Sequence, residues 1–197
     1  MVGFCISDDE VCCDASKDEI IRRYYDATNK MARGACNENE ISKIQMLFNQ
    51  AKINTDFRRT TVAAKECLKR TGHTSSAIEL EDGTIVTAHS SLLLGCSAAL
   101  LLNVMKHLAG IDHDTKLIPQ SMIEPIQYTK VNYLGGHNPR LHTDEVLVAL
   151  SVLSNVDDRC TKALAQLPKL RGCQVHCTVM LSEVDQKIFK KLGVNLT

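Results

Sequence analysis

The sequence predicts a mixed fold (α+β or α/β), in which a helical N-terminal subdomain precedes a three-layer α/β sandwich. Residues 1–72 place apolar side chains at helical spacing. From residue 73 onward, short runs rich in β-branched residues alternate with helical patterns, which indicates a sheet covered by helices. We therefore expect two domains, a helical subdomain at 1–72 and an α/β subdomain at 73–197.

The composition is typical of a soluble globular protein and argues against two classes of partner. Hydrophobic residues make up 44% and charged residues 23% of the 197 residues, and the formal net charge is +0. With four Phe, four Tyr and no Trp, the neutral chain offers nucleic acid neither a basic field nor many stacking surfaces. The longest apolar run, residues 92–102, is too short to span a bilayer. We expect neither a nucleic acid nor a membrane as partner.

Cysteine usage predicts a reducing compartment. The chain has nine cysteines, an odd number at scattered positions, and Cys12 and Cys13 are adjacent. Polar residues at 7–10 interrupt the first apolar residues, so no secretory signal is expected. We interpret the cysteines as free thiols of a cytoplasmic protein.

Three helices are predicted in the N-terminal subdomain. A capping box at residues 16–19 starts the first helix, and Gly34 ends it. Asn37 caps the second helix. The third helix covers residues 57–70 and stops at Gly72, where we place the domain boundary.

Residues 76–110 form the centre of the predicted α/β subdomain. Two strand-like runs, residues 77–80 and 84–87, flank an Asp-Gly pair at 82–83, which is a strong hairpin signal. A helix at 92–108 follows and is apolar on nearly every face, so it must be covered on both sides.

The C-terminal half alternates helices, short strands and loops. We predict a helix at 121–130, a strand at 131–134, a loop at 135–142, helices at 143–154 and 155–168, a strand at 173–181, a helix from Ser182 to Gly193 and a last strand at 194–197. Strands separated by helices in this order favour a sandwich.

Long runs of the sequence resemble the family called domain of unknown function 1846, also known as uncharacterised protein family 0371. They include residues 78–87, 138–147, 166–173 and 192–197. The resemblance covers essentially the whole chain, which corresponds only to the C-terminal portion of a family member. It implies a helical subdomain followed by an α/β subdomain with cytidine-deaminase-like topology. Family members are mostly bacterial, are much longer, and carry upstream a Gly-Ser-Gly-Lys stretch like a phosphate-binding loop.

The implied topology raises the question of a zinc site, but the motifs of a zinc deaminase are missing. That chemistry needs His-x-Glu or Cys-x-Glu and a Pro-Cys-x-x-Cys motif. Cys96 lies near the start of the predicted helix at 92–108, but Ala98 stands where glutamate is needed. On a strand, Cys173 and Cys177 share one face and His176 faces the other. We expect no metal and no cofactor in this part of the protein.

The loop at 135–144 is the best candidate site, because Arg and His side chains precede a helix N-terminus that favours anions. A second helix N-terminus follows two serines, and an anion pocket forms if the two ends meet. The predicted substrate-binding residues are Arg140, His142, His137, Asn138, Ser90 and Ser91. Spacing alone identifies no catalytic residue.

A purely structural alternative stays open for the same loop. Residues 138–139 then make a turn, and Thr143 only caps the next helix. Arg140 pairs with Asp144 or Glu145 and binds no ligand.

Two functions of different class follow. The first is the substrate side of a nucleotide-dependent enzyme, with an anionic, phosphate-bearing small molecule in the loop. The alternative is a non-catalytic assembly domain whose helices mediate homo-oligomerisation.

We expect the chain to lack ATP hydrolysis on its own. The only glycine pair, Gly135-Gly136, is followed by His137 and Asn138, whereas a phosphate-binding loop needs Lys and Ser or Thr. Phosphate release from ATP by the purified chain should equal the buffer blank. Turnover that persists through rigorous purification would contradict the prediction.

Overall fold

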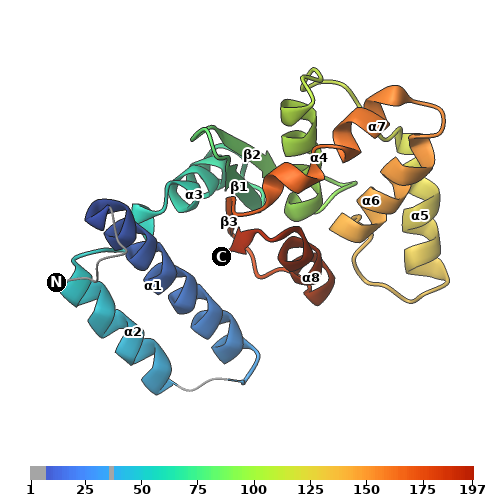
Figure 1. The fold of residues 1–197 in the computed structure, drawn as a ribbon. Helices are drawn as coiled ribbons and strands as arrows, with labels where there is room; N and C mark the ends of the chain where they lie inside the picture. The colour runs from blue at the N-terminus through green and yellow to red at the C-terminus, as the bar shows by residue number, and fades with distance from the viewer. Residues whose placement is uncertain (1–7, 36–37) are drawn as a thin grey trace.

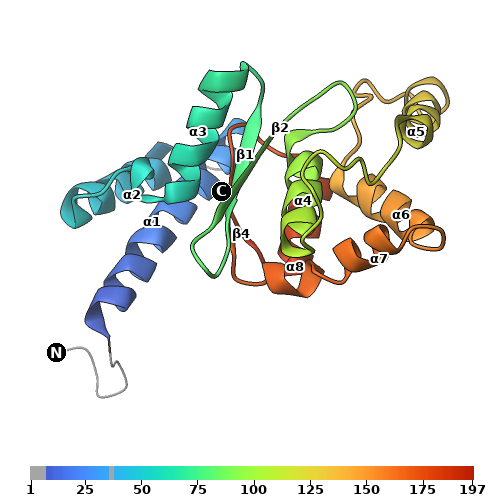
Figure 2. The same ribbon diagram turned by 90° about the horizontal axis from the view of Figure 1, so that it is seen from above.

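The computed structural model describes residues 8–35 and 38–197, which form three layers (Figures 1 and 2). A sheet lies in the middle. Helices α1 and α3 cover one face, and α4 with the helices that follow it covers the other. The mixed α/β fold is thus confirmed. The predicted helix cap at Asn37 lies outside the described residues, as do Cys5 and Cys36.

The N-terminal layer consists of α1 (Asp9–Ala32), α2 (Glu38–Ala51), a 3-10 turn (Thr55–Phe57) and α3 (Arg59–Thr71). The predicted start of α1 at residue 16 is wrong. The Asp8 side chain accepts a hydrogen bond from the backbone N–H of Val11 at 3.0 Å and caps the helix more than two turns earlier. Gly72 ends α3 in the left-handed conformation, φ 70°, as predicted. Helix α3 packs against the sheet of the predicted second domain. The domain boundary after residue 72 stays a prediction.

The sheet has four strands in the order β2-β1-β3-β4 in the described part of the chain. They are β1 (Ser75–Glu79), β2 (Ile85–His89), β3 (Gln174–Cys177) and β4 (Asn195–Leu196). β1 runs antiparallel to both β2 and β3, whereas β3 and β4 are parallel. The predicted hairpin is confirmed, and Gly83 takes the positive φ that its tight turn requires.

Helix α4 (Cys96–Leu108) is the centre of the hydrophobic core. Leu100 and Leu101 have no exposed surface, and Met105 is equally buried. The predicted start at residue 92 is four residues too early, because the Oγ of Ser91 accepts the backbone N–H groups of residues 93 and 94 and holds a turn there. Neither α4 nor any other helix among the described residues is long and apolar enough to cross a membrane.

Five further elements complete the far layer. They are α5 (Gln120–Asn132), α6 (Thr143–Leu153), α7 (Asp158–Leu164), a second 3-10 turn (Leu167–Leu170) and α8 (Glu183–Leu192). The predicted strand at 131–134 is wrong. Helical hydrogen bonds continue through Tyr133, and Leu134 stays 77% exposed, so the burial that would favour a strand does not occur. Helix α7 starts three residues later than predicted, because the side chain of Asp157, rather than that of Asn155, caps it.

Truncation of a buried and of an exposed leucine tests the placement of α4 at the core. Leu101→Ala should lower the free energy of unfolding by about 2–5 kcal/mol, because Leu101 is fully buried in α4. Leu92→Ala is the matched control, since Leu92 is 85% exposed, and it should change stability by less than about 0.5 kcal/mol. Chemical denaturation measures both. Equal effects of the two substitutions would contradict the placement of α4 at the core.

Candidate functional site

The loops that precede α4 and α6 are joined by backbone hydrogen bonds. Leu94 and Leu141 form an isolated parallel bridge. The N–H of Leu141 donates to the carbonyl of Leu93 at 2.9 Å, and the N–H of Gly95 donates to the carbonyl of Leu141 at 3.1 Å. The two helix N-termini that the sequence analysis singled out therefore lie side by side.

Helix α5 supports both loops from one side. The Gln127 side chain donates to the carbonyl of Leu92 at 3.1 Å, and the Lys130 ammonium donates to the carbonyl of Arg140 at 2.8 Å. The chain passes so close to α5 at Gly136 that a Cβ there would lie 2.9 Å from the Lys130 carbonyl oxygen. The loop containing Arg140 is thus fixed by three elements, α4, α5 and α6.

Arg140 lies half-buried at the junction of the two loops. The Asn138 carboxamide oxygen accepts the Arg140 N–H at 3.2 Å and forms the turn that the structural alternative assumed. The guanidinium Nε donates to the carbonyl of Ser91 at 2.7 Å. Glu145 pairs with Lys130 at 2.9 Å and not with Arg140. The two terminal guanidinium nitrogens bond no described residue, so they can donate to a ligand.

His142 is held by a buried carboxylate. Its Nδ1 lies 2.9 Å from Oδ2 of Asp185, whose carboxylate is almost fully buried. Asp185 also accepts hydrogen bonds from the backbone and hydroxyl of Thr143 and from the hydroxyl of Ser182. His142 precedes α6 and Asp185 lies in the first turn of α8, so the contact joins two helix N-termini.

Electrostatics favour an ionic His142–Asp185 pair. Burial alone would raise the pKa of Asp185, but the hydrogen bonds from His142, Thr143 and Ser182 outweigh it and lower the pKa to about 2. The hydrogen bond to Asp185 raises the pKa of His142, against the opposing effect of burial. Asp185 is therefore ionised at neutral pH, and the protonated share of His142 is larger than that of a free imidazole.

The predicted site residues Ser90, Ser91 and His137 have other contacts or none among the described residues. Ser90 is buried, and its hydroxyl accepts a hydrogen bond from Thr74 at 2.9 Å, so it is turned toward the sheet. The hydroxyl of Ser91 is used in the turn before α4, and only its carbonyl meets Arg140. His137 is exposed and bonds no described residue. The structure thus holds Arg140 and His142 two residues apart in one loop, each with its own partner, and leaves the serine hydroxyls in other contacts.

Sequence reasoning missed Asp185 as part of this site. The backbone N–H of Asp185 donates to the hydroxyl of Ser182, so the residue lies in the first turn of the helix predicted from Ser182. Nothing in the local pattern indicates that its carboxylate also reaches across to His142, 43 positions earlier in the chain. An acid expected in the first turn of one helix and a His directly before another helix are the signal that could have raised the question.

The arrangement can bind an anion and hold a proton. Arg140 offers two free N–H-bearing nitrogens, and Asp185 orients the imidazole of His142 through Nδ1. The Nε2 of His142 bonds no described residue, so it is open to a ligand, and a carboxylate behind the ring is the arrangement that stabilises an imidazolium. In the described residues, no group of three or more His, Cys, Asp or Glu side chains is placed to hold a metal ion.

Comparison with known proteins points to one family. Residues 1–52 match the family model for the N-terminal part of the domain of unknown function DUF1846, and residues 56–197 match the model for its C-terminal part. Full-length alignment of the chain gives 51% identity to a UPF0371 protein of Corynebacterium urealyticum, 48% to one of Corynebacterium efficiens and 42% to one of Streptococcus pyogenes. In each case the whole chain aligns and spans 40% of the relative.

The His142–Asp185 pair makes the free energy of unfolding fall at both low and high pH. Asp185 has a lowered pKa, so its contribution is present above the unfolded value near 3.9 and is lost as pH falls toward about 2. His142 has a raised pKa, so its contribution is complete below about 6.5 and is lost as pH rises through the raised value. The pair therefore stabilises the fold most between about pH 4 and 6.5.

Asp185→Asn tests this pair. It should cost about 1.5–3 kcal/mol at pH 5.5 and less at pH 8.5, and it should return the pKa of His142 toward about 6.5. Chemical denaturation at the two pH values and an NMR titration of the His142 ring measure these effects. Asp144→Asn is the matched control, because Asp144 lies in the first turn of α6 without a hydrogen bond to a described side chain. An unchanged His142 pKa in Asp185→Asn would contradict the pairing.

Proposed function

We propose a substrate-binding role for this chain, which belongs to the family of domain of unknown function DUF1846. In this proposal, it forms the substrate side of a nucleotide-dependent enzyme and binds a phosphate-bearing small molecule at Arg140 and His142. The observation that carries the proposal is the guanidinium of Arg140, which is hydrogen-bonded at Nε but to no described residue at its two terminal nitrogens. A side chain fixed through Nε, with both terminal nitrogens unbonded, loses little conformational freedom when it binds an anion.

His142 adds a second group that can donate to an anion, because the hydrogen bond to Asp185 raises its pKa and favours the protonated ring. It stands at the N-terminus of α6, where the positive end of the helix dipole favours negative charge. Asp185 accepts the N–H of Thr143, so the helix end is partly satisfied before a ligand arrives. The ligand contacts we propose therefore come from the two side chains rather than from the helix end alone.

We propose that nucleotide binding belongs to a part of the longer relatives with which this chain does not align. The chain spans 40% of the length of the first relatives that it matches. The family resemblance implies a phosphate-binding loop upstream in longer members. Cytidine-deaminase-like topology of the α/β part is also a proposal, which is supported by a first strand that lies between the second and third and runs antiparallel to both.

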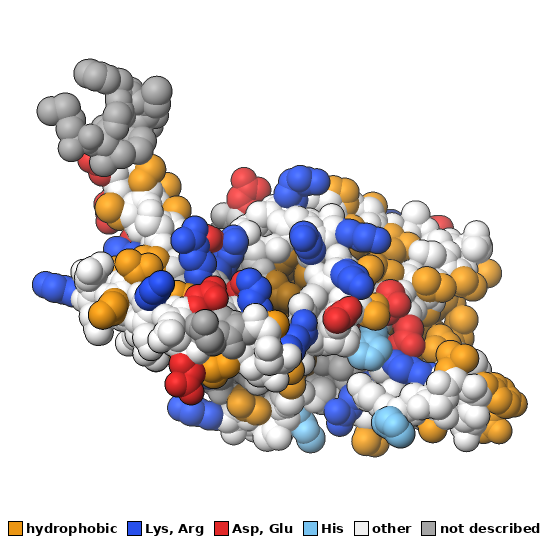
Figure 3. All heavy atoms as spheres, turned by 90° about the horizontal axis from the view of Figure 1, so that it is seen from below, with side chains coloured by type: hydrophobic (Ala, Val, Ile, Leu, Met, Phe, Trp, Pro, Cys, Tyr) orange, Lys and Arg blue, Asp and Glu red, His pale blue; other side chains and the backbone are white. Residues whose placement is uncertain are grey.

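The alternative function is assembly into a homo-oligomer. Helix α6 exposes Val148 and Val152, one turn apart, and Val156 follows with 82% of its surface exposed. Tyr133 and Leu134 are similarly exposed at the end of α5. Figure 3 shows hydrophobic side chains gathered at the end of the molecule that carries these helices. Apolar groups on adjacent turns of one helix face favour contact with another protein surface.

Arg140→Lys tests the substrate-binding proposal. Lysine keeps the charge but loses the planar fork, so affinity for a phosphate-bearing ligand should fall about tenfold to a hundredfold, with little change in stability. Melting temperatures of the wild type and the variant, with and without a panel of sugar phosphates and nucleotides, measure both effects. Arg23→Lys on the exposed side of α1 is the matched control and should leave ligand shifts unchanged.

Two outcomes would contradict the proposal. A lower melting temperature of Arg140→Lys without any ligand effect would make Arg140 a structural residue. If no ligand shifts the wild type, and light scattering gives the mass of an oligomer, the assembly function is favoured instead.

A further inference from the structure

A cavity of about 330 Å³ lies between α4, the turn before it, and the segment that joins α4 to α5. Figure 2 shows α4 and α5 on one side of the sheet, with the joining segment, residues 109–119, running between them. Six of the apolar side chains that line the cavity are Leu93, Leu94, Leu102, Leu117, Ile118 and Ile123. A cavity of this size with a mainly apolar wall is typical of a small-molecule site.

Lys106 brings a positive charge to the wall of this cavity. Ala99 and Asn103 line the cavity from α4, and Lys106 follows them on the same stripe of the helix. The residue is only 9% exposed, so its side chain does not extend into water as a surface lysine does. Its ammonium donates to the carbonyls of His113 at 2.5 Å and Thr115 at 3.4 Å, and both residues also line the cavity. The charge is therefore held where α4 meets the joining segment.

The charge of Lys106 has no carboxylate partner in the described part of the chain, where its hydrogen bonds go to backbone carbonyls. Burial lowers the pKa of Lys106, and the carboxylates of Asp114 and Asp112, which act from a distance, oppose this effect only in part. Lys116 and Asp114 also line the cavity, but both are exposed and their charges are opposite. An ammonium has three N–H groups, so one remains for a ligand, and an anion would offset the cost of burying the charge.

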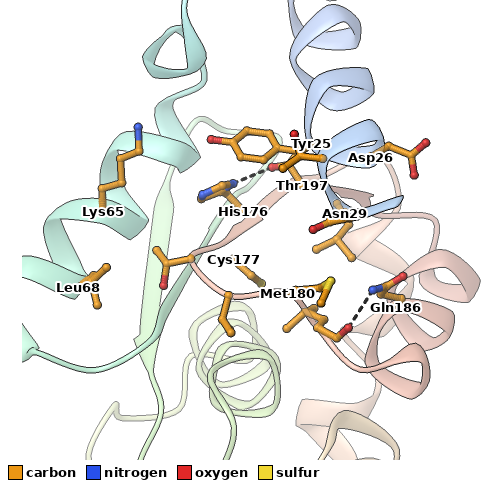
Figure 4. A pocket seen from close by; sticks show the side chains of 15 residues that line it. Tyr25, Asp26, Asn29, Lys65, Leu68, His176, Cys177, Met180, Gln186 and Thr197 are labelled. Atoms are coloured by element: carbon orange, nitrogen blue, oxygen red, sulfur yellow. Dashed lines mark hydrogen bonds between the residues drawn. The ribbon is translucent and has the colours of Figure 1, made fainter. Parts of the chain in front are cut away.

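The cavity on the other face of the sheet differs in this respect (Figure 4). Its volume is about 460 Å³, and its walls come from α1, α3 and β3. Asp26 and Lys65 line it, but Asp26 pairs with Lys30 at 2.7 Å and Lys65 pairs with Asp56 at 2.7 Å. Both ion pairs are partly exposed, so they favour no charge type in a ligand. A buried lysine without a carboxylate partner thus distinguishes the cavity beside α4.

We propose that the cavity beside α4 binds a monocarboxylic acid with an apolar body, whose carboxylate accepts a hydrogen bond from the ammonium of Lys106. The leucine and isoleucine side chains of the wall bury the apolar body, and each buried methylene group strengthens binding. One buried ammonium balances one carboxylate, whereas a phosphate dianion would leave a charge unbalanced in an apolar cavity. The inference is separate from the function proposed for Arg140, because neither Arg140 nor His142 is among the described residues that line this cavity.

Calorimetry with hexanoate, acetate and 1-hexanol tests the two parts of the proposal on the wild type. Hexanoate should bind about tenfold more tightly than 1-hexanol, which has the same apolar body without the charge. It should bind at least about tenfold more tightly than acetate, which has the carboxylate without the apolar body. Methyl NMR should show that hexanoate shifts the resonances of Leu102 and Leu117, which line the cavity.

Lys106→Met tests the role of the ammonium, because methionine keeps an unbranched side chain and removes the charge. Its affinity for hexanoate should fall about tenfold, to the level of 1-hexanol. Lys69→Met is the matched control, since Lys69 is exposed on α3 at the other face of the sheet, and it should bind hexanoate as the wild type does. If chemical denaturation shows that Lys106→Met does not fold, the ligand series on the wild type decides alone.

Four results would overturn the inference. They are no binding of hexanoate, equal affinities of the wild type for hexanoate and 1-hexanol, an unchanged affinity for hexanoate in folded Lys106→Met, and methyl shifts confined to Leu68 and Leu196, which line the cavity on the other face.

Discussion

The short backbone bridge between Leu94 and Leu141 is the constraint on which the candidate site depends. Leu141 is fully buried, so the bridge is closed off from water and its hydrogen bonds have no competing partner. It places the first turns of α4 and α6 side by side and puts Arg140 within reach of Ser91. Helix α8 then completes the site from the other side, because Asp185 meets His142. Loss of the bridge would separate groups that are far apart in sequence.

A second constraint separates the two faces of the sheet. Successive residues of a strand face opposite sides of a sheet, so β3 turns Cys177 toward α4 and His176 toward α1 and α3. Arg58 fastens the α3 side. Its buried guanidinium donates to the Gln174 side chain and to the carbonyl of Asn195, while the nearest carboxylate, on Asp18, lies 3.9 Å from its Nε. These hydrogen bonds tie the start of α3 to β3 and β4, which makes the helical layer part of the fold rather than a loose addition.

Local signals in the sequence predicted more of the fold than of the site. The hairpin at Gly83 and the helix ends at Gly72 and Gly193 depend on backbone conformations that single residues determine, so they could be predicted. The strand expected at 131–134 failed because burial, which only tertiary packing decides, is absent there. Asp185 illustrates the limit for function, because a carboxylate that caps one helix can also bind a side chain on another.

The joined loops before α4 and α6 are the binding surface that we propose for an anion. Amide hydrogen exchange with and without inorganic pyrophosphate, followed residue by residue, tests this most directly. We predict slower exchange at residues 91–95 and 138–143 when pyrophosphate is present, because ligand contacts to Arg140 and His142 would oppose opening of the bridge. Unchanged exchange in both loops, or protection confined to α1 and α2, would contradict the central claim.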